Sequence, residues 1–523
     1  MEATEFEIKL QVPEHRLKAV AARVGTSSAI RTRMRAVYFD TDDGRLAAAG
    51  IALRLRKEGQ HWVQTLKLGS AAILSRLEHN VVRKGGAEPE LDISLHEGSE
   101  AGSAFMRAWR GTLAESEELP LLNERYRTDI LRTHRLHRMR GGSVELALDV
   151  GLISSGGLTW PVRELEIERI NGSANLVLES ARQWVDRDGL WLDVRSKAER
   201  GHRLSMARMR ADQGQAIQDP KMGSAVSAAL GPPRGSLNQQ DFQTAWAFVQ
   251  AVMRTSLGSV LRNASEISSG CHLPEHIHQF RIGLRRLRSL MRLSRGWVPP
   301  WGDSVTGALQ ETFEELGRSR DLMVMQQQYG AALAAAGAPF ADWPQVEAAD
   351  EPPDPTNLMR RPSVNLALLH LLRYSLGLDP VPLMASASAG DADTVHRFER
   401  RLGRWQETLV REASRFNSLN DLQRHDLRKR IKRLRYALDA SACLLHRNHL
   451  SKKWDRYLLV LAKAQAEMGS LCDHMTAHAY WRQAAQMDSR YWFAVGWFSA
   501  RLDQEAKRAQ KALRRLAAAK FPI

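Results

Sequence analysis

Polar and apolar residues alternate in short segments from Glu5 to about Leu204. Alternation of this kind places successive side chains on opposite faces and is typical of β-strands. In the first segment, Glu5, Glu7 and Lys9 fall on one face, while the apolar residues between them fall on the other. The first part of the chain is therefore predicted to form amphipathic strands.

From Phe242 onward, apolar residues recur every three or four positions instead, which predicts helices. Stretches 339–362 and 377–390 interrupt this pattern and predict long loops. A Gly- and Pro-rich stretch precedes the helical part and predicts a linker. We expect an α+β multidomain protein. It would comprise a β-rich domain at 1–208, a linker at 209–238 and an all-α helical-bundle domain at 239–523.

The charged face recurs along the strand segments of the first part. Beyond the first segment, it comprises Arg54 and Arg56, Thr65 and Lys67, Arg76 and Glu78, Arg125 and Arg127, Glu145 and Asp149, and Glu164, Glu166 and Glu168. Any one segment is explained by a strand with its charged side in water. The set differs, because acidic and basic strands are separated along the chain as if they faced each other. We therefore expect an antiparallel β-barrel tunnel with charges inside and flanking helices at 14–24 and 173–186.

Such a charge distribution suits phosphoryl transfer, in which a protein mainly positions the phosphates and balances their charge. Arginine and lysine side chains bind non-bridging phosphate oxygens. Carboxylates repel phosphate, so carboxylates beside basic residues indicate bound divalent cations, and their oxygen ligands suit Mg²⁺ or Mn²⁺. A metal ion can also activate the attacking water.

The helical part contains an internal repeat. The segment His278-x-x-Arg281-x-x-x-Arg285-Arg286-Leu287-Arg288 returns as His425-x-x-Arg428-x-x-x-Lys432-Arg433-Leu434-Arg435 with every spacing kept. At about 100° per residue, the first, fourth, eighth and eleventh positions lie on one face of a helix. Apolar residues occupy the opposite face in both copies. Each copy therefore predicts a helix that is apolar behind and cationic in front.

A solvated helix face usually mixes acids with bases, whereas residues 278–295 contain six arginines and no Asp or Glu. Like charges at this spacing repel each other, so the pattern favours an anionic ligand. No aromatic residues interleave the arginines for base stacking, which favours a polymer of phosphate over nucleic acid. The two histidines are interpreted either as ligand contacts or as helix-face histidines with a hydrogen-bond partner.

The composition agrees with a polyanionic partner. Lys and Arg number 75 against 59 Asp and Glu, which gives a net charge of +16 and a pI near 10.0. None of the three cysteines, Cys271, Cys443 and Cys472, stands in a metal-binding spacing. The start of the sequence resembles no signal peptide and no run is long enough to span a membrane, so we expect a cytoplasmic protein without a membrane partner.

These segments, in this order, resemble the CYTH superfamily of triphosphate tunnel enzymes over about residues 1–205. The match includes Glu5-x-Glu7-x-Lys9 and Ser196-Lys197-Ala198-Glu199-Arg200-Gly201. The resemblance implies phosphate contacts from Lys9, Arg54, Arg56, Lys67, Arg127 and Lys197, with Arg125 as the alternative to Arg127. It implies metal contacts from Glu5, Glu7, Asp149, Glu164 and Glu166, and Glu168 shares their face. The catalytic group would comprise Glu5, Glu7, Lys9 and Glu166, with Glu78 and Glu145 as further candidates.

The same resemblance indicates an inorganic triphosphatase that uses Mg²⁺ or Mn²⁺. The sequence lacks the His-Phe-x-x-Pro segment associated with the cyclase branch, which favours hydrolysis. Two alternatives stay open. One is a polyphosphate-binding protein without catalysis, which the intact carboxylates argue against. The other is a thiamine or nucleoside triphosphatase, for which Tyr38, Trp62 and Tyr126 could stack on an organic ring.

The helical part, from about 240 to 523, resembles the CHAD domain, a helical polyphosphate-binding module named for its histidines. Leu316-Gly317-Arg318-Ser319-Arg320-Asp321 is similar to the segment that follows the first basic helix of that family. The resemblance implies that polyphosphate contacts His278, Arg281, Arg285, Arg286, Arg288, His425, Arg428, Lys432, Arg433 and Arg435. Inorganic triphosphate and polyphosphate, including polyphosphate granules, are the expected partners, and nucleic acid is disfavoured.

Overall fold

A computed structural model describes residues 2–69, 75–84, 87–114, 117–214, 244–344, 353–378, 391–445 and 451–522. The chain divides into two compact units. Unit 1 contains 1–231, 257–280 and 355–378, and unit 2 contains 232–256, 281–354 and 379–523. The predicted linker at 209–238 lies outside the described residues from 215 onward, and the predicted domain boundaries stay a prediction.

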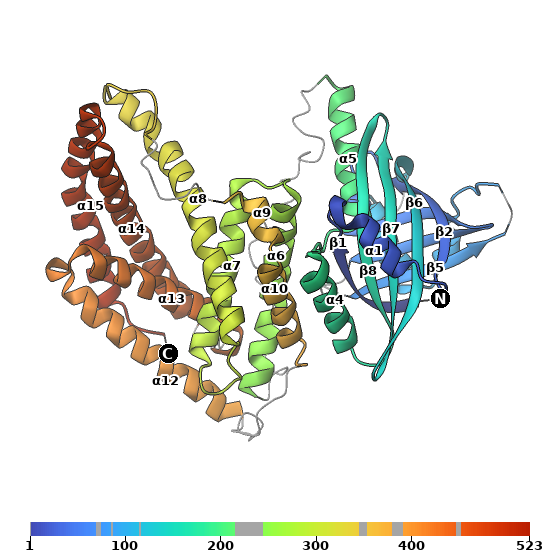
Figure 1. Cartoon of the computed structure of the whole chain (residues 1–523). Coiled ribbons are helices and arrows are strands. Elements are labelled where there is room, and N and C mark those ends of the chain that lie inside the picture. Colours follow the sequence, from blue (N-terminus) through green and yellow to red (C-terminus); the bar gives the residue numbers. More distant parts are fainter. Residues whose placement is uncertain are drawn as a thin grey trace. The chain divides into compact units, whose positions relative to one another are not determined.

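Unit 1 is built on an antiparallel sheet (Figure 1). Its strands are β1 (Glu2–Gln11), β2 (Ile30–Asp40), β3 (Ile51–Glu58), β4 (His61–Gly69), β5 (Ser75–Arg83), β6 (Asn123–Met139), β7 (Gly142–Ser155), β8 (Leu158–Asn171) and β9 (Trp191–Leu192). Their order is β5-β4-β3-β2-β6-β7-β8-β1-β9, with a further pairing between β1 and β5. The sequence correctly predicts the antiparallel strands and their helical cover.

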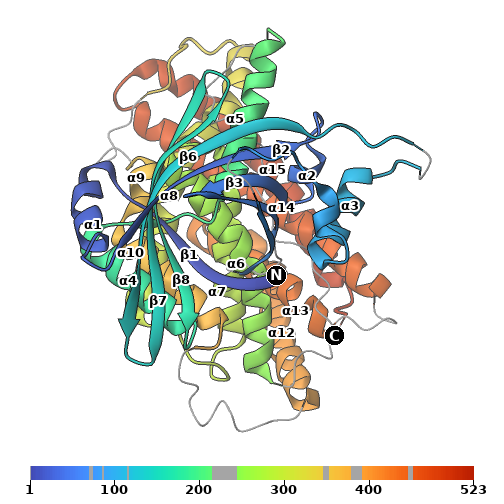
Figure 2. The ribbon, with the colours of Figure 1, turned by 90° about the vertical axis from the view of Figure 1, so that its right-hand side faces the viewer.

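The expectation of a closed barrel needs correction at β1. Residues Glu2 to Phe6 of this strand pair with β5, whereas Glu7 to Gln11 pair with β8. No residue of β1 is paired with both β5 and β8 in these registers, and Leu10 and Gln11 pair with β9 on their other side, so the sheet is open and does not close along the length of β1. Figure 2 shows the sheet curving from β1, β7 and β8 toward β2 and β3.

The apolar face of the sheet is buried beneath helices, as the alternation predicts. The helices of this part are η1 (Glu14–Arg16), α1 (Leu17–Val24), α2 (Arg45–Ala48), η2 (Ile93–His96), α3 (Glu100–Arg110), α4 (Asn175–Asp188) and α5 (Lys197–Asp212). Leu53 and Leu66 of β3 and β4 form a core cluster with Leu46 of α2 and Phe105 of α3. Burying apolar side chains in this way contributes about 1.5–3 kcal/mol each. The charged face is thereby left for α5 to approach.

The helical part contains α6 (Ala245–Ser269), α7 (Pro274–Leu293), α8 (Asp303–Ala335), α9 (Pro355–Arg360), α10 (Pro362–Ser375), α12 (Asp391–Ser414), η5 (Phe416–Ser418), α13 (Asp421–Leu445), α14 (Ser451–Ala484), η6 (Ser489–Tyr491) and α15 (Trp492–Ala518). The division between the units falls within α6 and α7. In unit 1, α10 packs on α4. In unit 2, Tyr329, Trp481 and Phe498 form part of a buried cluster.

The sequence also predicts two long loops and no membrane span. The predicted loop at 339–362 contains α9, and its residues 345–352 lie outside the described part, as do 379–390 of the second predicted loop. Among the described helices, none combines the length and apolar character that a membrane span requires.

Candidate functional site

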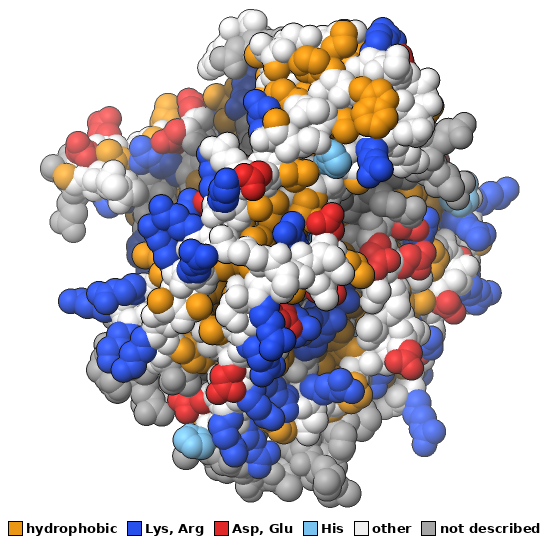
Figure 3. Space-filling model, turned by 90° about the vertical axis from the view of Figure 1, so that its left-hand side faces the viewer, with side chains coloured by type: hydrophobic (Ala, Val, Ile, Leu, Met, Phe, Trp, Pro, Cys, Tyr) orange, Lys and Arg blue, Asp and Glu red, His pale blue; other side chains and the backbone are white. Residues whose placement is uncertain are grey.

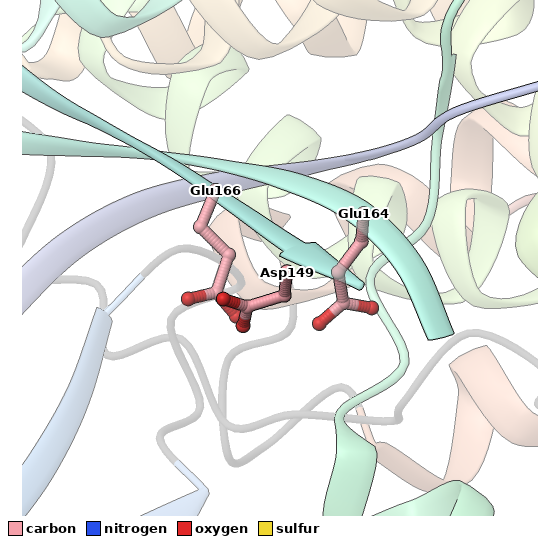
Figure 4. Close-up of side chains that lie close together, drawn as sticks. All are labelled: Asp149, Glu164 and Glu166. Atoms are coloured by element: carbon pink, nitrogen blue, oxygen red, sulfur yellow. The ribbon is translucent and has the colours of Figure 1, made fainter. Parts of the chain in front are cut away.

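Three carboxylates gather on the charged face of the sheet. Asp149 lies on β7 directly opposite Glu164 on β8, and Glu166 follows two residues later on the same face. One carboxylate oxygen from each lies within 4.8 Å of the others, and Figure 4 shows the three side chains converging. Asp149 and Glu164 are fully buried. Such a concentration of negative charge requires compensating cations nearby.

Lys197, the first residue of α5, supplies one of these cations. Its Nζ lies 2.7 Å from Asp149 Oδ2 and 2.8 Å from Glu166 Oε1, and it also pairs with Glu164. Ser196 and Glu199 form a capping box that begins the helix at this point. The cap thus directs the first residue of α5 into the carboxylate cluster.

Arg132 and Arg200 complete the ion pairs around the carboxylates. The Nε and Nη2 atoms of Arg132 each donate to Asp149 at 2.7 Å, and Nη2 also pairs with Glu166. Arg200 is almost fully buried and pairs with Glu164. Arg200 lies three residues after Lys197, so both side chains project from the same side of α5.

These ion pairs keep the site charged at neutral pH. Burial alone would raise the pKa of Glu166, but Lys197 and Arg132 hold it well below its usual range. Burial likewise opposes the charge of Glu164, whose pKa is lowered by Arg200 and Lys197. Burial would lower the pKa of Lys197, but the carboxylates raise it above its ordinary value. All of these groups therefore remain ionised through the physiological range.

The donor set fits a divalent cation. Asp149, Glu164 and Glu166 offer hard carboxylate oxygens of the type that Mg²⁺ and Mn²⁺ prefer. The ammonium group of Lys197 contacts all three, which shows that the space between them stabilises positive charge. A phosphate group that attracted Lys197 would release carboxylate oxygens for a metal ion.

Strand β1 carries the charged residues Glu5, Glu7 and Lys9. Lys9 is buried, is paired in register with Glu166, and has its Nζ 3.8 Å from Glu7 Oε1. Glu7 is paired with Glu168, which is half-buried on the same face. The side chain of Glu5 lies outside the described part, although its backbone continues β1. The structure therefore places Glu7, Lys9 and Glu168 on the charged face beside the carboxylate cluster.

A second group of basic residues lies on β3 and β4. Arg54 donates to Tyr38 Oη at 3.3 Å, and Lys67 pairs with Glu78. Burial alone would raise the pKa of Glu78, but Lys67 and Arg54 lower it to about 2. Burial and the charge of Arg54 lower the pKa of Arg56 to about 10. The like charges of Arg54 and Arg56 therefore repel each other, and a bound anion would relieve this repulsion.

The structure does not bring Arg127 to the cluster. Its side chain is about half exposed and donates to Glu124 at 2.6 Å. Arg132 occupies the expected place instead, because it lies an odd number of residues from Arg127 on β6 and so faces the opposite side. Sequence reasoning missed Arg132, although its place opposite Asp149 could have been found from strand parity.

The alternative Arg125 is also directed elsewhere. It is buried, donates to Asp42 Oδ1 at 3.0 Å and contacts Met209. A register shift between β2 and β6 beside Tyr38 and Phe39 explains why its burial departs from simple alternation. Arg200 was also missed as a site residue, although it belongs to the segment that begins at Ser196.

Gly201 allows α5 to approach the sheet. A Cβ atom at this position would lie 2.2 Å from the ring of Tyr126, which stacks on Tyr38 with centroids 4.6 Å apart. We expect Gly201→Ala to lower the free energy of unfolding by about 1–3 kcal/mol, because the buried ring cannot move away freely. Displacement of Lys197 should also slow any reaction at the site. Thermal unfolding would measure the effect, and an unchanged melting temperature would contradict this packing.

In unit 2, three arginines on one face of α7 lie close to an aromatic ring of α8. The guanidinium carbons of Arg281, Arg285 and Arg288 lie 4.6, 5.1 and 5.9 Å from the ring centroid of Phe313. A Cβ at Gly317 would lie 2.8 Å from Arg281, so glycine makes room for this arginine. The ring spaces the three guanidinium groups along the helix.

The second copy of the repeat adds cationic side chains from α13 to those of α7. Arg428 of α13 pairs with Asp473 at 3.0 Å, and the guanidinium carbon of Arg285 lies 5.9 Å from the ring of Tyr436. Burial and the charges of Arg428 and Arg285 lower the pKa of Lys432 to about 7. Figure 3 shows Lys and Arg side chains gathered on a face of the helical part. We call Arg281, Arg285, Arg288, Arg428 and Lys432 the cationic surface of unit 2.

The remaining residues predicted to bind polyphosphate differ in their surroundings. Burial lowers the pKa of both Arg286 and Arg433, and Arg433 lies 5.8 Å from the ring centroid of Trp405. Burial and Lys429 lower the pKa of His425. His278 lies in the part of α7 that belongs to unit 1, Arg435 is half-buried on α13, and the side chains of 318–324 lie outside the described part.

Comparison with known proteins matches both parts of the chain. The CYTH domain model matches residues 3–202, and the CHAD domain model matches residues 251–482. An inorganic triphosphatase of Haemophilus influenzae is 28% identical over 177 residues, or 34% of this chain and 47% of that protein. The chain thus spans about half the length of this curated relative.

Among solved structures, the CHAD domain from Ricinus communis is 21% identical with a TM-score of 0.43, covering 56% of this chain and 97% of that chain. A protein from Hippeastrum, described as an adenylyl cyclase with a dominant triphosphatase activity, is 18% identical with a TM-score of 0.27, covering 41% of this chain and 97% of that chain. The two family models confirm the resemblances found in the sequence. The chain therefore carries a CYTH domain followed by a CHAD domain.

Proposed function

We propose that the chain hydrolyses inorganic triphosphate to diphosphate and phosphate with a divalent metal ion. The observation that carries the proposal is the buried cluster of Asp149, Glu164 and Glu166, which is surrounded by cations on the charged face of the sheet. Triphosphatase activity in the relative from Haemophilus influenzae supports the same reaction. Anion binding alone would be weakened by these carboxylates, which disfavours a purely binding protein.

The residues have complementary tasks in this reaction. Arg54, Arg56 and Lys67 would bind the non-bridging oxygens, and we include Arg132 in place of Arg127 because it reaches the carboxylate cluster. Lys197 would move from the carboxylates to the terminal phosphate. Arg132 is held by two carboxylates before substrate binds, so its guanidinium group would need little reorganisation during the reaction.

The carboxylates would hold the metal ion and the water. Glu5 and Glu7 on β1 would join Asp149, Glu164 and Glu166, with Glu168 at the end of the row. When bound, a divalent cation would neutralise phosphate charge and make the water more acidic. Glu166 would help to hold the metal ion and to orient the water bound to it. Mg²⁺ and Mn²⁺ are both proposed, since each accepts carboxylate oxygens.

We also propose that the cationic surface of unit 2 binds polyphosphate. Its arginines and lysine come from both copies of the repeat, and burial together with the charges of Arg428 and Arg285 lowers the pKa of Lys432. A phosphate chain would relieve this repulsion. The helical domain would then hold the enzyme on polyphosphate, including granules in the cytoplasm. Binding should weaken steeply as salt rises, because counterions are released on association.

Phosphate release from triphosphate with Mg²⁺ or Mn²⁺ tests the proposed reaction. ATP, thiamine triphosphate and long polyphosphate serve as competing substrates, and the double variant Glu5→Gln with Glu7→Gln serves as the metal-site variant. We expect triphosphate to be preferred and the variant to be inactive. Preference for an organic triphosphate would favour the alternative in which Tyr38 contacts the ring. No release from any substrate, with salt-sensitive retention on polyphosphate, would leave a binding protein.

A further inference from the structure

The segment leading into α5 is attached to helices from the second family match. The Leu192 amide donates to Asn365 Oδ1 of α10 at 2.9 Å, and the Val194 amide donates to Ser265 Oγ of α6 at 3.0 Å. The amide between them donates to the Lys9 carbonyl of β1 at 3.2 Å. All of these residues belong to unit 1. The segment is therefore held from the sheet on one side and from α6 and α10 on the other.

A buried carboxylate of α6 reinforces this attachment. Glu266 accepts from Arg203 Nη1 at 2.8 Å and from Arg195 Nη1 at 3.3 Å. Arg195 also donates to Asp193 through Nε at 3.0 Å and Nη2 at 2.7 Å. All four side chains are at least nine-tenths buried. Removing the charge of Glu266 would leave Asp193 paired with Arg195 and would take from buried Arg203 the carboxylate it pairs with, which is unfavourable away from water.

These ion pairs flank the site residues of α5. Arg195 precedes Lys197 by two residues, and Arg203 follows Arg200 by three. The side chains of Lys197 and Arg200 reach the carboxylate cluster, while Arg195 and Arg203 reach Glu266. The beginning of α5 is thus held between two sets of carboxylates. A second link joins Arg262 of α6 to Glu199 in the capping box at 3.0 Å.

We propose that Glu266 is a positioning residue of the hydrolytic site. It lies within the CHAD match, whereas Lys197 and Arg200 lie within the CYTH match, so the helical domain would complete the site in addition to binding polyphosphate. Glu266 acts through α5 and touches neither substrate nor metal. The inference rests on the proposed triphosphatase function. It predicts that changes in α6 alter hydrolysis of triphosphate even when no polyphosphate is present.

The test compares Glu266→Gln with the matched control Glu275→Gln in the full chain. Glu275 is exposed at the start of α7 and accepts from Gln279. With triphosphate and saturating Mn²⁺, we expect Glu266→Gln to lower kcat/KM about tenfold, mainly by raising KM, because a displaced Lys197 would bind phosphate poorly. The control should match the unchanged protein. Equal kinetics for both variants would overturn the inference while leaving the proposed function intact.

A double variant separates positioning from general loss of structure. If Glu266 acts through Lys197, then Glu266→Gln should change kcat/KM less than twofold in a Lys197→Ala background. A full tenfold loss in that background would overturn the inference. Ser265→Ala removes the hydrogen bonds of its hydroxyl with the Val194 amide and the Leu261 carbonyl but no charge, so it should remain folded with a slightly lower melting temperature and raise KM about threefold. An unchanged KM in folded Ser265→Ala would also count against it, whereas inactivity of the unchanged protein would refute the proposed function itself.

Discussion

Replacing Glu166 by glutamine is expected to lower the rate of triphosphate hydrolysis by about a hundredfold to a thousandfold at saturating metal. Glu166 is ionised because Lys197 and Arg132 hold its pKa well below the usual range. Glutamine keeps the shape of the side chain but removes the charge that would hold a metal ion and orient its bound water. Steady-state phosphate release with Mg²⁺ and with Mn²⁺ measures the loss.

Two further variants show whether this loss belongs to the site. Glu179→Gln is the matched control, because Glu179 lies on α4 and pairs with nearby Arg182 at 2.8 Å. It should retain full activity. Glu164→Gln should be inactive and also less stable by about 3–5 kcal/mol, since Glu164 is fully buried and leaves Arg200 without its charge partner. Activity of Glu166→Gln within threefold of the unchanged protein would rule out the proposed role.

Alternation along the strands predicts which side chains share a face, but it leaves strand pairing undetermined. It correctly placed Asp149, Glu164 and Glu166 together, because their separations within a strand are even and their strands form a hairpin. Closure of the barrel depended on β1, whose two neighbours come from distant parts of the chain. Local periodicity carries no signal for dividing one strand between two partners.

Parity also explains why Arg127 does not lie beside the carboxylate cluster. Arg127 fits the order of basic residues along the chain, but β6 is a long strand and its later residues reach the cluster. Arg132 lies opposite Asp149, and only the register between β6 and β7 shows this. The contact of Arg200 with Glu164 depends on the start of α5 facing the sheet, which the sequence does not show. These contacts are set by tertiary packing rather than by local pattern.

The helical repeat was more informative, because one helix face can be read from spacing alone. The stripe of Arg281, Arg285 and Arg288 lies together as expected, around the ring of Phe313. The sequence could not show that Lys432 of the second copy would be buried beside Arg428 and Arg285, which together lower its pKa.

Polyphosphate binding is expected to weaken by up to about a hundredfold between pH 7 and pH 9, because Lys432 has a pKa of about 7 without ligand. A bound anion would favour the charged form and raise this pKa. Above pH 7, binding must therefore be accompanied by proton uptake, and the dissociation constant rises by up to about tenfold per pH unit until the pKa of the complex is reached. Titration with long polyphosphate at constant ionic strength measures the slope.

Lys432→Met distinguishes this residue from the rest of the cationic surface. Because methionine cannot take up a proton, the variant should bind more weakly at pH 7 and show little change up to pH 9. In the unchanged protein, a rise in pH should weaken polyphosphate binding but increase the free energy of unfolding. Lys432 binds a proton less readily when folded than at its ordinary pKa of 10.5, so the free energy of unfolding should rise with pH from about 7 to 10.5. A steep pH dependence that survived in Lys432→Met would assign the proton to another group, since the arginines around it stay charged throughout this range.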